Sequence, residues 1–525
     1  MISDFINSLI NTSQRHASQA ALQCDGLTLT YGELFDRAQR LACELETCGV
    51  KPGDRLALWG RRGITDYVHV LGIWMTGAAY VPLGTLYGPT RNASILSAAR
   101  VAGVLFAPDT ELEAEAIAQA LRQMPGKPHL SLDWSLRYNT QAGSWFAPCR
   151  HDSLAVTDDD LDVPSDLAYL LFTSGSTGTP KGVPIGFDSL KAYLEGMQSL
   201  YPIDASDRVS QMAQLSFDAS VHEIFWTWSQ GACLCVIPDR GILMWPRYVQ
   251  DQQITSMLLV PSSVHLAAKA GVLQRSPMPS LRSVFLGAEA VTHQVVGQLH
   301  AVAPQAVFVN LWGPTESTVA FTHHRINVQN TLQAAIPIGK PLPGQRVMLD
   351  TGLDDSHSSQ NNDADADADA VGEILQIGTQ VMQGYWQETT LNTERFVTLN
   401  GERWFKSGDL ARWDPLHGYW FMGRKDRQVK FKGYRIELDA VESVVRAVLQ
   451  QTEIAVILSR HLEASEPEQL VCFMSRTSPP TSDELAQMAS QSAAYMVPSV
   501  FRLIDAIPLS PSGKTDYKAL EKLLP

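Results

Sequence analysis

Short apolar runs alternate with helix-like patterns throughout residues 1–350 of this sequence. The runs "DRLALWG" and "VAGVLFAP" begin at Asp54 and Val101, and their length and composition predict buried strands. Residues 31–49 instead carry apolar side chains at helical spacing and end at a glycine. Strands that alternate with helices favour an α/β fold, in which helices cover a largely parallel sheet.

The pattern changes near residues 423–433, "GRKDRQVKFKG", where glycines and charges mix with short apolar stretches. A helix pattern at residues 437–450 and two strand-like runs follow, which is enough for a small, lid-like α+β domain. We therefore predict a large N-terminal domain, residues 1–425, and a small C-terminal domain, residues 426–525. Residues 354–370, "DDSHSSQNNDADADADA", are polar and acidic, and we expect them to form a flexible surface loop.

The formal charge is −14 with no long basic run, which disfavours nucleic acid or an anionic membrane as the main partner. None of the seven cysteines has the spacing of a zinc site, and free thiols in a reducing compartment are the simpler interpretation. No stretch reaches the roughly 18 apolar residues that a membrane-spanning helix needs, and the N-terminus lacks the pattern of a signal peptide. These observations predict a soluble, cytoplasmic protein.

A loop rich in glycine and hydroxyl residues, "LLFTSGSTGTPKG", spans residues 170–182. Glycines let a backbone approach an anion closely, and hydroxyl and N–H groups then donate to phosphate oxygens. The loop departs from the P-loop pattern, because Pro180 precedes and Gly182 follows Lys181, and it also lacks the dinucleotide pattern G-x-G-x-x-G. We predict a phosphate-binding turn between a strand and a helix at residues 188–200, with a plain surface turn as the alternative.

Nine further motifs lie around this loop. They read "LTYGEL", "GAAYVPL", "FDASVHE", "NLWGPTEST", "GEILQIG", "FKSGDL", "GRKDRQVKFKGYRIEL", "YMVP" and "LSPSGKTD". Together with "FTSGSTGTPKG", they make the chain resemble the adenylate-forming superfamily, and within it the amino-acid-activating adenylation domains of nonribosomal peptide synthetases and their stand-alone relatives. The resemblance covers nearly the whole chain. It implies an AMP-forming ligase with a large α/β domain of layered sheets and helices and a small mobile C-terminal α+β domain.

The reaction that the resemblance implies has two halves. A carboxylate attacks the α-phosphate of ATP to give an acyl adenylate and pyrophosphate, and a thiol then takes the acyl group as a thioester. The resemblance assigns the β- and γ-phosphates to the loop residues Thr173, Ser174, Gly175, Ser176, Thr177, Gly178 and Lys181. It assigns the adenine and the ribose to Gly287, Ala288, Glu289, Trp312, Asp409 and Arg424.

Three residues are implied to act on the reacting groups. Lys514 corresponds to the family's catalytic lysine, which stabilises negative charge between the carboxylate and the α-phosphate. Thr315 is implied to lie beside the α-phosphate, and Glu316 to bind a Mg²⁺ ion, since oxygen ligands suit this hard cation. Lys514 lies more than 330 residues after the phosphate loop, so a mobile domain has to bring it in. Asp426 corresponds to the hinge, and rotation there after adenylation is implied to remove Lys514 and to bring the segment "KFKGYR" near the thiol.

Asp218 of "FDASVHE" indicates which acid is activated. In the resembled family an aspartate at this place pairs with the α-ammonium of an amino acid, and a buried carboxylate needs such a partner; a capping aspartate is the alternative. The other pocket residues that the resemblance implies are Ala219, His222, Leu258, Val284, Leu286, Leu311, Val319 and Ala320. Leu286 and Leu311 would fill the space that a large substrate needs, so we expect glycine first and alanine of either hand second. His222 either narrows the pocket or binds a polar group.

No carrier motif follows Lys514, so the resemblance implies transfer to the phosphopantetheine thiol of a separate carrier protein. The chain is similar to D-alanine–carrier protein ligases and to glycine–carrier protein ligases of lipid A glycylation. Two other classes stay open: an acyl- or aryl-CoA ligase or luciferase-like oxygenase of the same superfamily, and a non-catalytic nucleotide-binding protein. Asp218 disfavours the first class, and the presence of Lys514, Asp409 and Glu316 disfavours the second.

Overall fold

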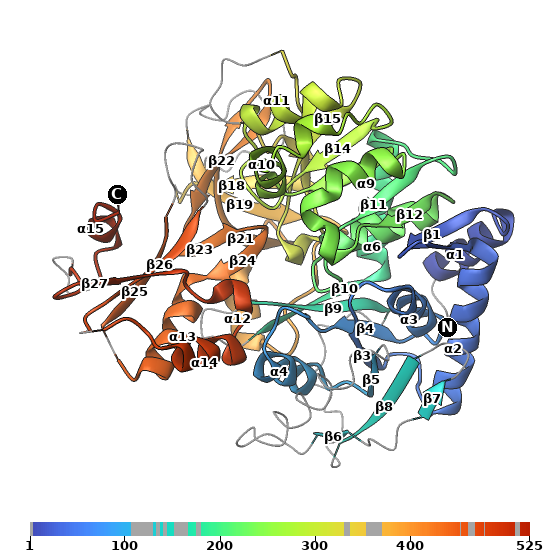
Figure 1. Cartoon of the computed structure of the whole chain (residues 1–525), viewed down its shortest axis with the longest axis horizontal. Coiled ribbons are helices and arrows are strands. Elements are labelled where there is room, and N and C mark those ends of the chain that lie inside the picture. Colours follow the sequence, from blue (N-terminus) through green and yellow to red (C-terminus); the bar gives the residue numbers. More distant parts are fainter. Residues whose placement is uncertain are drawn as a thin grey trace.

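Two large sheets with helices between and around them form the body of the molecule (Figure 1). The computed structural model describes residues 4–106, 130–132, 137–139, 144–151, 166–174, 180–329, 336–352, 370–451, 453–459, 468–476, 478–509 and 515–524. The predicted acidic loop, residues 354–370, lies outside these ranges except for its last residue. Within them, no helix has both the length and the apolar character that a membrane span requires.

The larger sheet has a parallel centre and antiparallel edges. Its nine strands are β1 (Ala20–Cys24), β2 (Leu27–Thr30), β11 (Arg208–Gln211), β12 (Cys233–Val236), β13 (Ser256–Leu259), β14 (Ser283–Leu286), β15 (Val307–Trp312), β16 (Thr322–Arg325) and β17 (Lys340–Pro341). They are ordered β17-β16-β15-β14-β13-β11-β12-β1-β2, and every neighbouring pair from β15 to β1 is parallel. The carboxyl ends of these parallel strands therefore lie at one edge, where side chains from several strands can meet.

The second sheet is built in the same way. Its eight strands are β3 (Arg55–Trp59), β4 (Ala79–Pro82), β5 (Gly103–Phe106), β6 (Leu130–Leu132), β7 (Arg137–Asn139), β8 (Ser144–His151), β9 (Leu167–Thr173) and β10 (Lys181–Gly186). The central strands β9, β4, β3 and β5 are parallel, and all four residues of β4 and of β5 are buried. Burial on both faces explains why these strands appear in the sequence as continuous apolar runs. The predicted α/β class with largely parallel sheets is confirmed.

Helices fill the space between the sheets and cover their outer faces. They are α1 (Asp4–Arg15), α2 (Tyr31–Thr47), α3 (Ile64–Met75), α4 (Pro89–Ala99), α6 (Phe187–Leu200), α7 (Ala219–Val221), η2 (His222–Trp226), α8 (Thr227–Ser229), η3 (Asp239–Met244), α9 (Trp245–Asp251), α10 (Pro261–Lys269), η4 (Leu273–Arg275), α11 (His293–Val302), η5 (Thr315–Ser317) and α12 (Thr389–Arg395). The helix predicted at residues 31–49 is α2. Thr30 and Glu33 begin it with reciprocal side-chain hydrogen bonds to the backbone, which satisfy N–H groups of its first turn.

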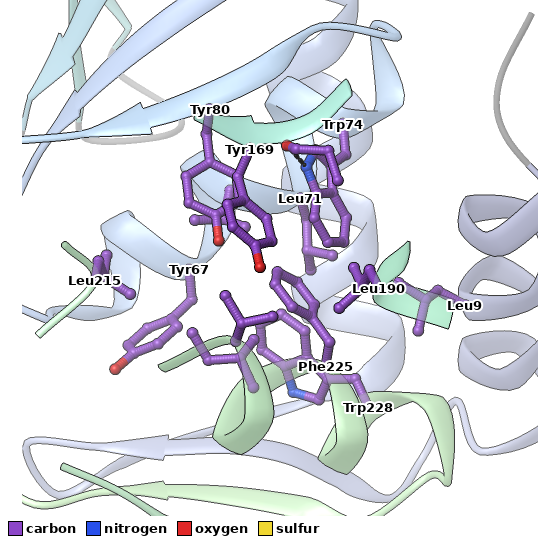
Figure 2. Close-up of a cluster of buried hydrophobic side chains, with 14 of the residues drawn as sticks. Leu9, Tyr67, Leu71, Trp74, Tyr80, Tyr169, Leu190, Leu215, Phe225 and Trp228 are labelled. Carbon is purple, nitrogen blue, oxygen red and sulfur yellow. Dashed lines mark hydrogen bonds between the residues drawn. The ribbon is translucent and has the colours of Figure 1, made fainter. Parts of the chain in front are cut away.

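An aromatic cluster joins the two sheets (Figure 2). Trp74 of α3 stacks on Phe225 of η2 with ring centroids 4.1 Å apart, and its indole nitrogen donates to the carbonyl of Ala168 in β9 at 2.7 Å. Tyr80 and Tyr169 reach into the same cluster from β4 and β9. This packing holds the helical segment α7–η2–α8 firmly between the sheets, and that segment carries several of the predicted substrate residues.

A third, antiparallel sheet leads to the C-terminal part of the chain. It contains β18 (Arg346–Asp350), β19 (Val371–Ile377), β20 (Phe396–Leu399), β21 (Glu402–Asp414) and β22 (Gly418–Arg424). A hairpin of β23 (Gln428–Phe431) and β24 (Tyr434–Glu437) follows. The remaining elements are α13 (Leu438–Leu449), β25 (Ile454–Ser459), β26 (Gln469–Met474), α14 (Ser482–Gln491), η7 (Ala494–Met496), β27 (Val500–Leu503) and α15 (Tyr517–Glu521). They make the compact α+β unit that the sequence predicts, with α13 and α14 beside the three-stranded sheet (Figure 1).

The phosphate turn is placed differently from the prediction. Lys181 begins β10, which pairs antiparallel with β9, so the turn joins two strands of a hairpin instead of a strand and a helix. Pro184 fits into β10 because this is the edge strand of its sheet and needs no outward N–H donor. Helix α6 begins only after Gly186, which takes the capping position one residue before it.

Candidate active site

The two ends of the phosphate turn lie side by side at the carboxyl end of β9. Thr173 and Lys181 face each other across the β9–β10 pair, and the Ser174 hydroxyl donates to the carbonyl of Arg435 in β24 at 2.9 Å. Gly175, Ser176, Thr177 and Gly178 lie outside the described residues. Burial lowers the pKa of Lys181, and the carboxylates of Glu437 and Glu316 act in the opposite direction.

Glu316 is a buried and fully paired carboxylate. It lies in η5, directly after β15, with 1% of its surface exposed. One oxygen accepts from the Tyr385 hydroxyl at 2.7 Å, and the other accepts from Arg435 of β24 at 2.6 Å. Burial alone would raise the pKa of Glu316, but the Arg435 guanidinium and the Tyr385 hydroxyl outweigh it and hold this pKa below its usual value. An ionised carboxylate is a suitable ligand for Mg²⁺. In this structure the carboxylate of Glu316 is paired with the guanidinium of Arg435 instead.

Asp409 and Arg424, the two residues predicted to hold the ribose, form an ion pair. They face each other across the pair of strands β21 and β22, and 3% of the surface of Asp409 is exposed. Burial raises the pKa of Asp409, and Arg424 opposes this rise. Arg424 also donates to both carboxylate oxygens of Asp426, at 2.7 and 2.9 Å. The predicted hinge residue is therefore linked through one guanidinium to the predicted ribose ligand.

The residues predicted to surround adenine also have structural contacts. Glu289 accepts from the backbone N–H and the hydroxyl of Ser262 at 2.7 and 2.8 Å, which satisfies the first turn of α10. Trp312, at the end of β15, packs in a small cluster with Phe321 and Ile338. A Cβ atom on Gly287 would lie 2.9 Å from the carbonyl oxygen of Leu311, so this close approach of two strands requires glycine. Ala288, the next residue, adopts the left-handed backbone conformation with φ 62°.

Asp218 lies at the start of the helical segment α7–η2–α8. Its pKa is raised by burial, while a hydrogen bond from the Thr315 side chain and the ammonium of Lys430 in β23 act in the opposite direction. The structure thus brings together Asp218, Thr315 and Glu316, which the sequence separates by almost 100 residues. The turn η2 is π-helical, a feature that often marks functional sites, and nothing in the sequence predicts it.

His222 of η2 is buried among aromatic side chains. Its Nδ1 atom is 2.8 Å from the hydroxyl of Tyr193, and its ring lies 4.9 Å from that of Trp226 and 5.3 Å from that of Phe285. Burial lowers the pKa of His222 to about 3. His222 is thus an uncharged aromatic ring whose Nδ1 atom is already bound, and its role in the substrate pocket stays a prediction.

The two faces of β14 pack in different parts of the core. Val284 and Leu286 point to the opposite side of the sheet, where they pack with residues of α10 and α11. Phe285 lies between them in sequence and faces His222, because alternate residues of a strand point to opposite faces. The predictions that Val284 and Leu286 line the substrate pocket stay predictions. The strand register pairs Leu258 with Phe285, which places Leu258 on the same face of the sheet as Phe285.

Other residues that the sequence assigns to the pocket gather near Phe285. Leu311 and Ala320 belong to the same buried cluster as Phe285, and Val319 packs against that cluster. Ala219 is half-buried in the first turn of α7, next to Asp218. His222 contacts Phe285 of this cluster, and the charged groups Lys430 and Glu316 act on the nearby carboxylate of Asp218.

The C-terminal unit presents its β23–β24 hairpin to this site. Besides the contacts of Arg435, the ring of Tyr434 lies 4.8 Å from that of Phe217 and stacks on Tyr495 at 3.8 Å. The predicted catalytic residue, Lys514, lies outside the described residues. Helix α15, which follows it, packs with Phe473 and other residues of β25 and β26 on the outer side of the C-terminal unit (Figure 1). Arg435 and Tyr385 were not predicted individually, since nothing local in the sequence shows that they meet Glu316.

Comparison with known proteins identifies the family. Residues 10–386 match the model of the family described as AMP-binding enzyme. The chain is 31% identical over 522 residues to one of the plipastatin synthase proteins of Bacillus subtilis, and 32% identical over 507 residues to phenyloxazoline synthase MbtB of a Mycobacterium species. These matches cover 98% and 94% of this chain but only 14% and 40% of the two relatives. The chain thus spans a minor part of the length of these synthases.

Solved structures agree with this result. The crystal structure of the Vibrio cholerae adenylation domain AlmE in complex with glycyl-adenosine-5'-phosphate is 26% identical, with a TM-score of 0.82 and coverage of 99% of this chain and 97% of that one. An artificially fused adenylation–PCP di-domain from Klebsiella oxytoca has the same fold, with a TM-score of 0.74, 22% identity and coverage of 95% and 94%. The chain belongs to the AMP-binding enzymes, and it is an adenylate-forming ligase related to the adenylation domains of nonribosomal peptide synthetases.

Proposed function

We propose that this enzyme activates a small amino acid, glycine before alanine or D-alanine, and transfers it to the phosphopantetheine thiol of a separate carrier protein. The observation that carries the proposal is the carboxylate of Asp218, whose pKa is raised by burial and which accepts a hydrogen bond from the Thr315 side chain. A buried carboxylate is expensive without a cation, and the α-ammonium of an amino acid supplies one. An acyl- or aryl-CoA ligase has no use for this carboxylate.

The size of the pocket supports glycine. The rings of Phe285 and His222 are in contact, and Leu311 belongs to the same buried cluster as Phe285. These bulky side chains are expected to leave little room for a large substrate. The glycyl adenylate in the related AlmE structure agrees with this preference.

In the first half of the reaction, a carboxylate oxygen of the amino acid bonds to the α-phosphorus of ATP while the bond to pyrophosphate breaks. We assign the ribose to Asp409 and Arg424, and the β- and γ-phosphates to the turn between β9 and β10 with Lys181. We assign adenine to residues 287–289 and Trp312. Mg²⁺ held by Glu316 would neutralise charge on the phosphates, which requires Arg435 to leave this carboxylate. Lys514 then stabilises the charge between the carboxylate and the α-phosphate.

In the second half, the thiol sulfur bonds to the acyl carbon and AMP leaves. We propose that residues 1–425 and 426–525 are two domains that rotate about Asp426 between the halves. The contacts of Arg435 and Tyr434 with the site support this, because they bring the "KFKGYR" segment to the place that the second half requires. We also propose a cytoplasmic location, which supplies ATP and a reducing medium for the six cysteines that are free in the described residues.

The experiment that tests amino-acid recognition is Asp218→Asn. The amide keeps the shape of the side chain but leaves the substrate ammonium without a counter-charge, which costs roughly 3–5 kcal/mol when a buried pair loses one partner. We expect the KM for glycine in ATP–pyrophosphate exchange to rise steeply while the KM for ATP stays within about twofold. An unchanged KM for glycine would make Asp218 a structural residue and would remove the basis of the proposal.

A further inference from the structure

Glu223 is a buried carboxylate that the reaction as described does not use. It follows His222 in the π-helical turn η2, and no part of its surface is exposed. One oxygen accepts from the backbone N–H of Met212 at 3.0 Å. The other accepts from the backbone N–H of Ala213 at 3.0 Å and from the side-chain amide of Gln211 at 3.2 Å. All three partners are N–H donors, which suits an ionised carboxylate that accepts and does not donate.

Gln211 is itself held in a fixed orientation at the end of β11. Its carbonyl oxygen accepts from the Tyr67 hydroxyl at 2.7 Å and from the guanidinium of Arg62 at 3.2 Å. Tyr67 lies at the edge of the aromatic cluster, with its hydroxyl pointing away from Trp74 (Figure 2). Arg62 is buried and forms an ion pair with the half-exposed Asp239. These contacts anchor the carboxylate of Glu223 to α3 and to the loop before it.

The segment that Glu223 binds leads directly to the predicted ammonium ligand. Met212 and Ala213 begin the connection between β11 and α7, and Asp218 ends it. Within it, the N–H of Phe217 donates to the carbonyl of Gln214 at 2.9 Å, and the N–H of Val221 donates to the carbonyl of Asp218 at 2.9 Å. Glu223 therefore ties the start of the connection to the helix at which the connection ends, and this closes a small ring of chain that contains Asp218.

We propose that Glu223 is a positioning residue, whose carboxylate holds the connection from Met212 to Phe217 so that Asp218 is aimed at the substrate ammonium. The inference has two consequences. The effect on the KM for glycine rests on the proposed function. The protection of the Met212 and Ala213 amides from hydrogen exchange does not. The two consequences can therefore be measured separately.

The test is Glu223→Gln, which keeps the size of the side chain but turns an NH₂ group toward one of the backbone N–H donors. Above a pH of about 8, the value to which burial raises the pKa of Glu223, the wild-type carboxylate is ionised. There we expect the variant to raise the KM for glycine at least tenfold, to change the KM for ATP less than twofold, and to let the backbone amides of Met212 and Ala213 exchange hydrogen faster. Unchanged amide exchange overturns the proposal whatever the substrate proves to be. A KM for glycine that does not change while the amides lose protection also overturns it, since Asp218 would then be aimed by other contacts.

Two further variants keep the test decisive if Glu223→Gln folds poorly. Tyr67→Phe removes only the hydroxyl that orients Gln211, and we expect a two- to threefold rise in the KM for glycine with the same amide signature. Asp207→Asn is the matched control, because Asp207 is a buried, paired carboxylate just before the other end of β11. We expect it to lower stability while the KM for glycine stays unchanged. A similar rise in KM for Asp207→Asn would mean that any loss of strand anchoring has this effect, and it would overturn the specific role of Glu223.

The pH profile gives an additional readout. Burial raises the pKa of Glu223 to about 8, while the N–H groups of Met212 and Ala213 and the charge of Arg62 favour its ionised form. The other ionisable groups around it are Tyr67, and Asp239 beyond Arg62. Protonated Glu223 resembles glutamine, so the wild-type KM for glycine should rise as the pH falls through about 8. Asp218 contributes equally in both proteins, so identical profiles for the wild type and Glu223→Gln would contradict the role of Glu223.

Discussion

Asp218 and His222 lie four positions apart on one helical segment, and burial shifts their pKa values in opposite directions. The pKa of Asp218 is raised by burial, and Thr315 and Lys430 only oppose that rise, so the site gains from an incoming cation. His222 stays neutral because burial lowers its pKa to about 3, and its Nδ1 atom is already bound to Tyr193. At the scale of single residues, we therefore propose that Asp218 favours a substrate with an ammonium group and that His222 offers no charge to the substrate side chain.

His69 of α3 is a second buried histidine, and it has no evident function. Both ring nitrogens are buried without a hydrogen-bond partner among the residues that the structure describes, and burial lowers the pKa of His69 to about 3. Below its ordinary pKa of 6.5 the unfolded chain binds a proton at this residue, while the folded chain does not until about pH 3. The free energy of unfolding therefore falls as the pH drops through this window.

We predict that His69→Leu stabilises the protein, because it removes a buried polar group whose unmade hydrogen bonds cost about 1–3 kcal/mol. The gain should grow between pH 6.5 and 3, where only the wild type loses stability through this residue. Urea unfolding at pH 7.5 and at pH 5 measures both effects. A variant that is less stable at both values would mean that the ring has partners that its surroundings do not reveal.

At the scale of elements, β14 shows where sequence reasoning succeeds and where it stops. The apolar pattern predicts that such strands are buried, but both faces of a central parallel strand are apolar, so the pattern does not tell them apart. A shift of one residue then moves every side chain to the other face. This is why the apolar pattern alone does not say which of Val284, Phe285 and Leu286 packs on which side of the sheet. Helices such as α2 and α13 have only one apolar side, so the sequence pattern shows which side is buried. It also predicts the ends of these helices within a few residues.

The face assignment makes a prediction for β14. Phe285→Ala should open space beside His222 and allow exchange with larger amino acids such as valine or leucine, while activity with glycine falls through looser binding. Leu286→Ala is the matched control on the opposite face. It should cost about 2–5 kcal/mol of stability, as other buried leucine truncations do, without any new substrate. New substrates for Leu286→Ala and none for Phe285→Ala would reverse the assignment. Amino-acid-dependent ATP–pyrophosphate exchange measures both variants.

At the scale of the whole molecule, the site is assembled from segments that are distant in the sequence. Glu316 meets Arg435 across 119 positions, and Ser174 meets the same residue across 261. Motif order predicts that these segments belong to one site, but which side chains touch depends on how the C-terminal unit packs against the body. The strand that follows the phosphate turn shows the same limit. The residues of β10 do not by themselves specify that this strand pairs with β9.

The arrangement of the C-terminal unit predicts opposite effects for two cationic residues. Arg435→Ala removes the partner of Glu316 in the observed arrangement, so transfer to a carrier thiol should fall at least tenfold while adenylation is maintained. Lys514→Ala should lower adenylation steeply and spare transfer from a preformed adenylate. Single-turnover assays of each half-reaction separate the two. Equal loss of both halves in both variants would contradict a domain that alternates between two positions.

The central claim is that the chain adenylates a small amino acid, and amino-acid-dependent ATP–pyrophosphate exchange tests it most directly. The assay should include all common amino acids, D-alanine, and acids without an amino group. We predict the fastest exchange with glycine, weaker exchange with alanine of one hand, and none with aromatic amino acids or with acids that lack the ammonium. Exchange with a bulky aromatic amino acid or an aryl acid, and none with glycine or alanine, would contradict the account.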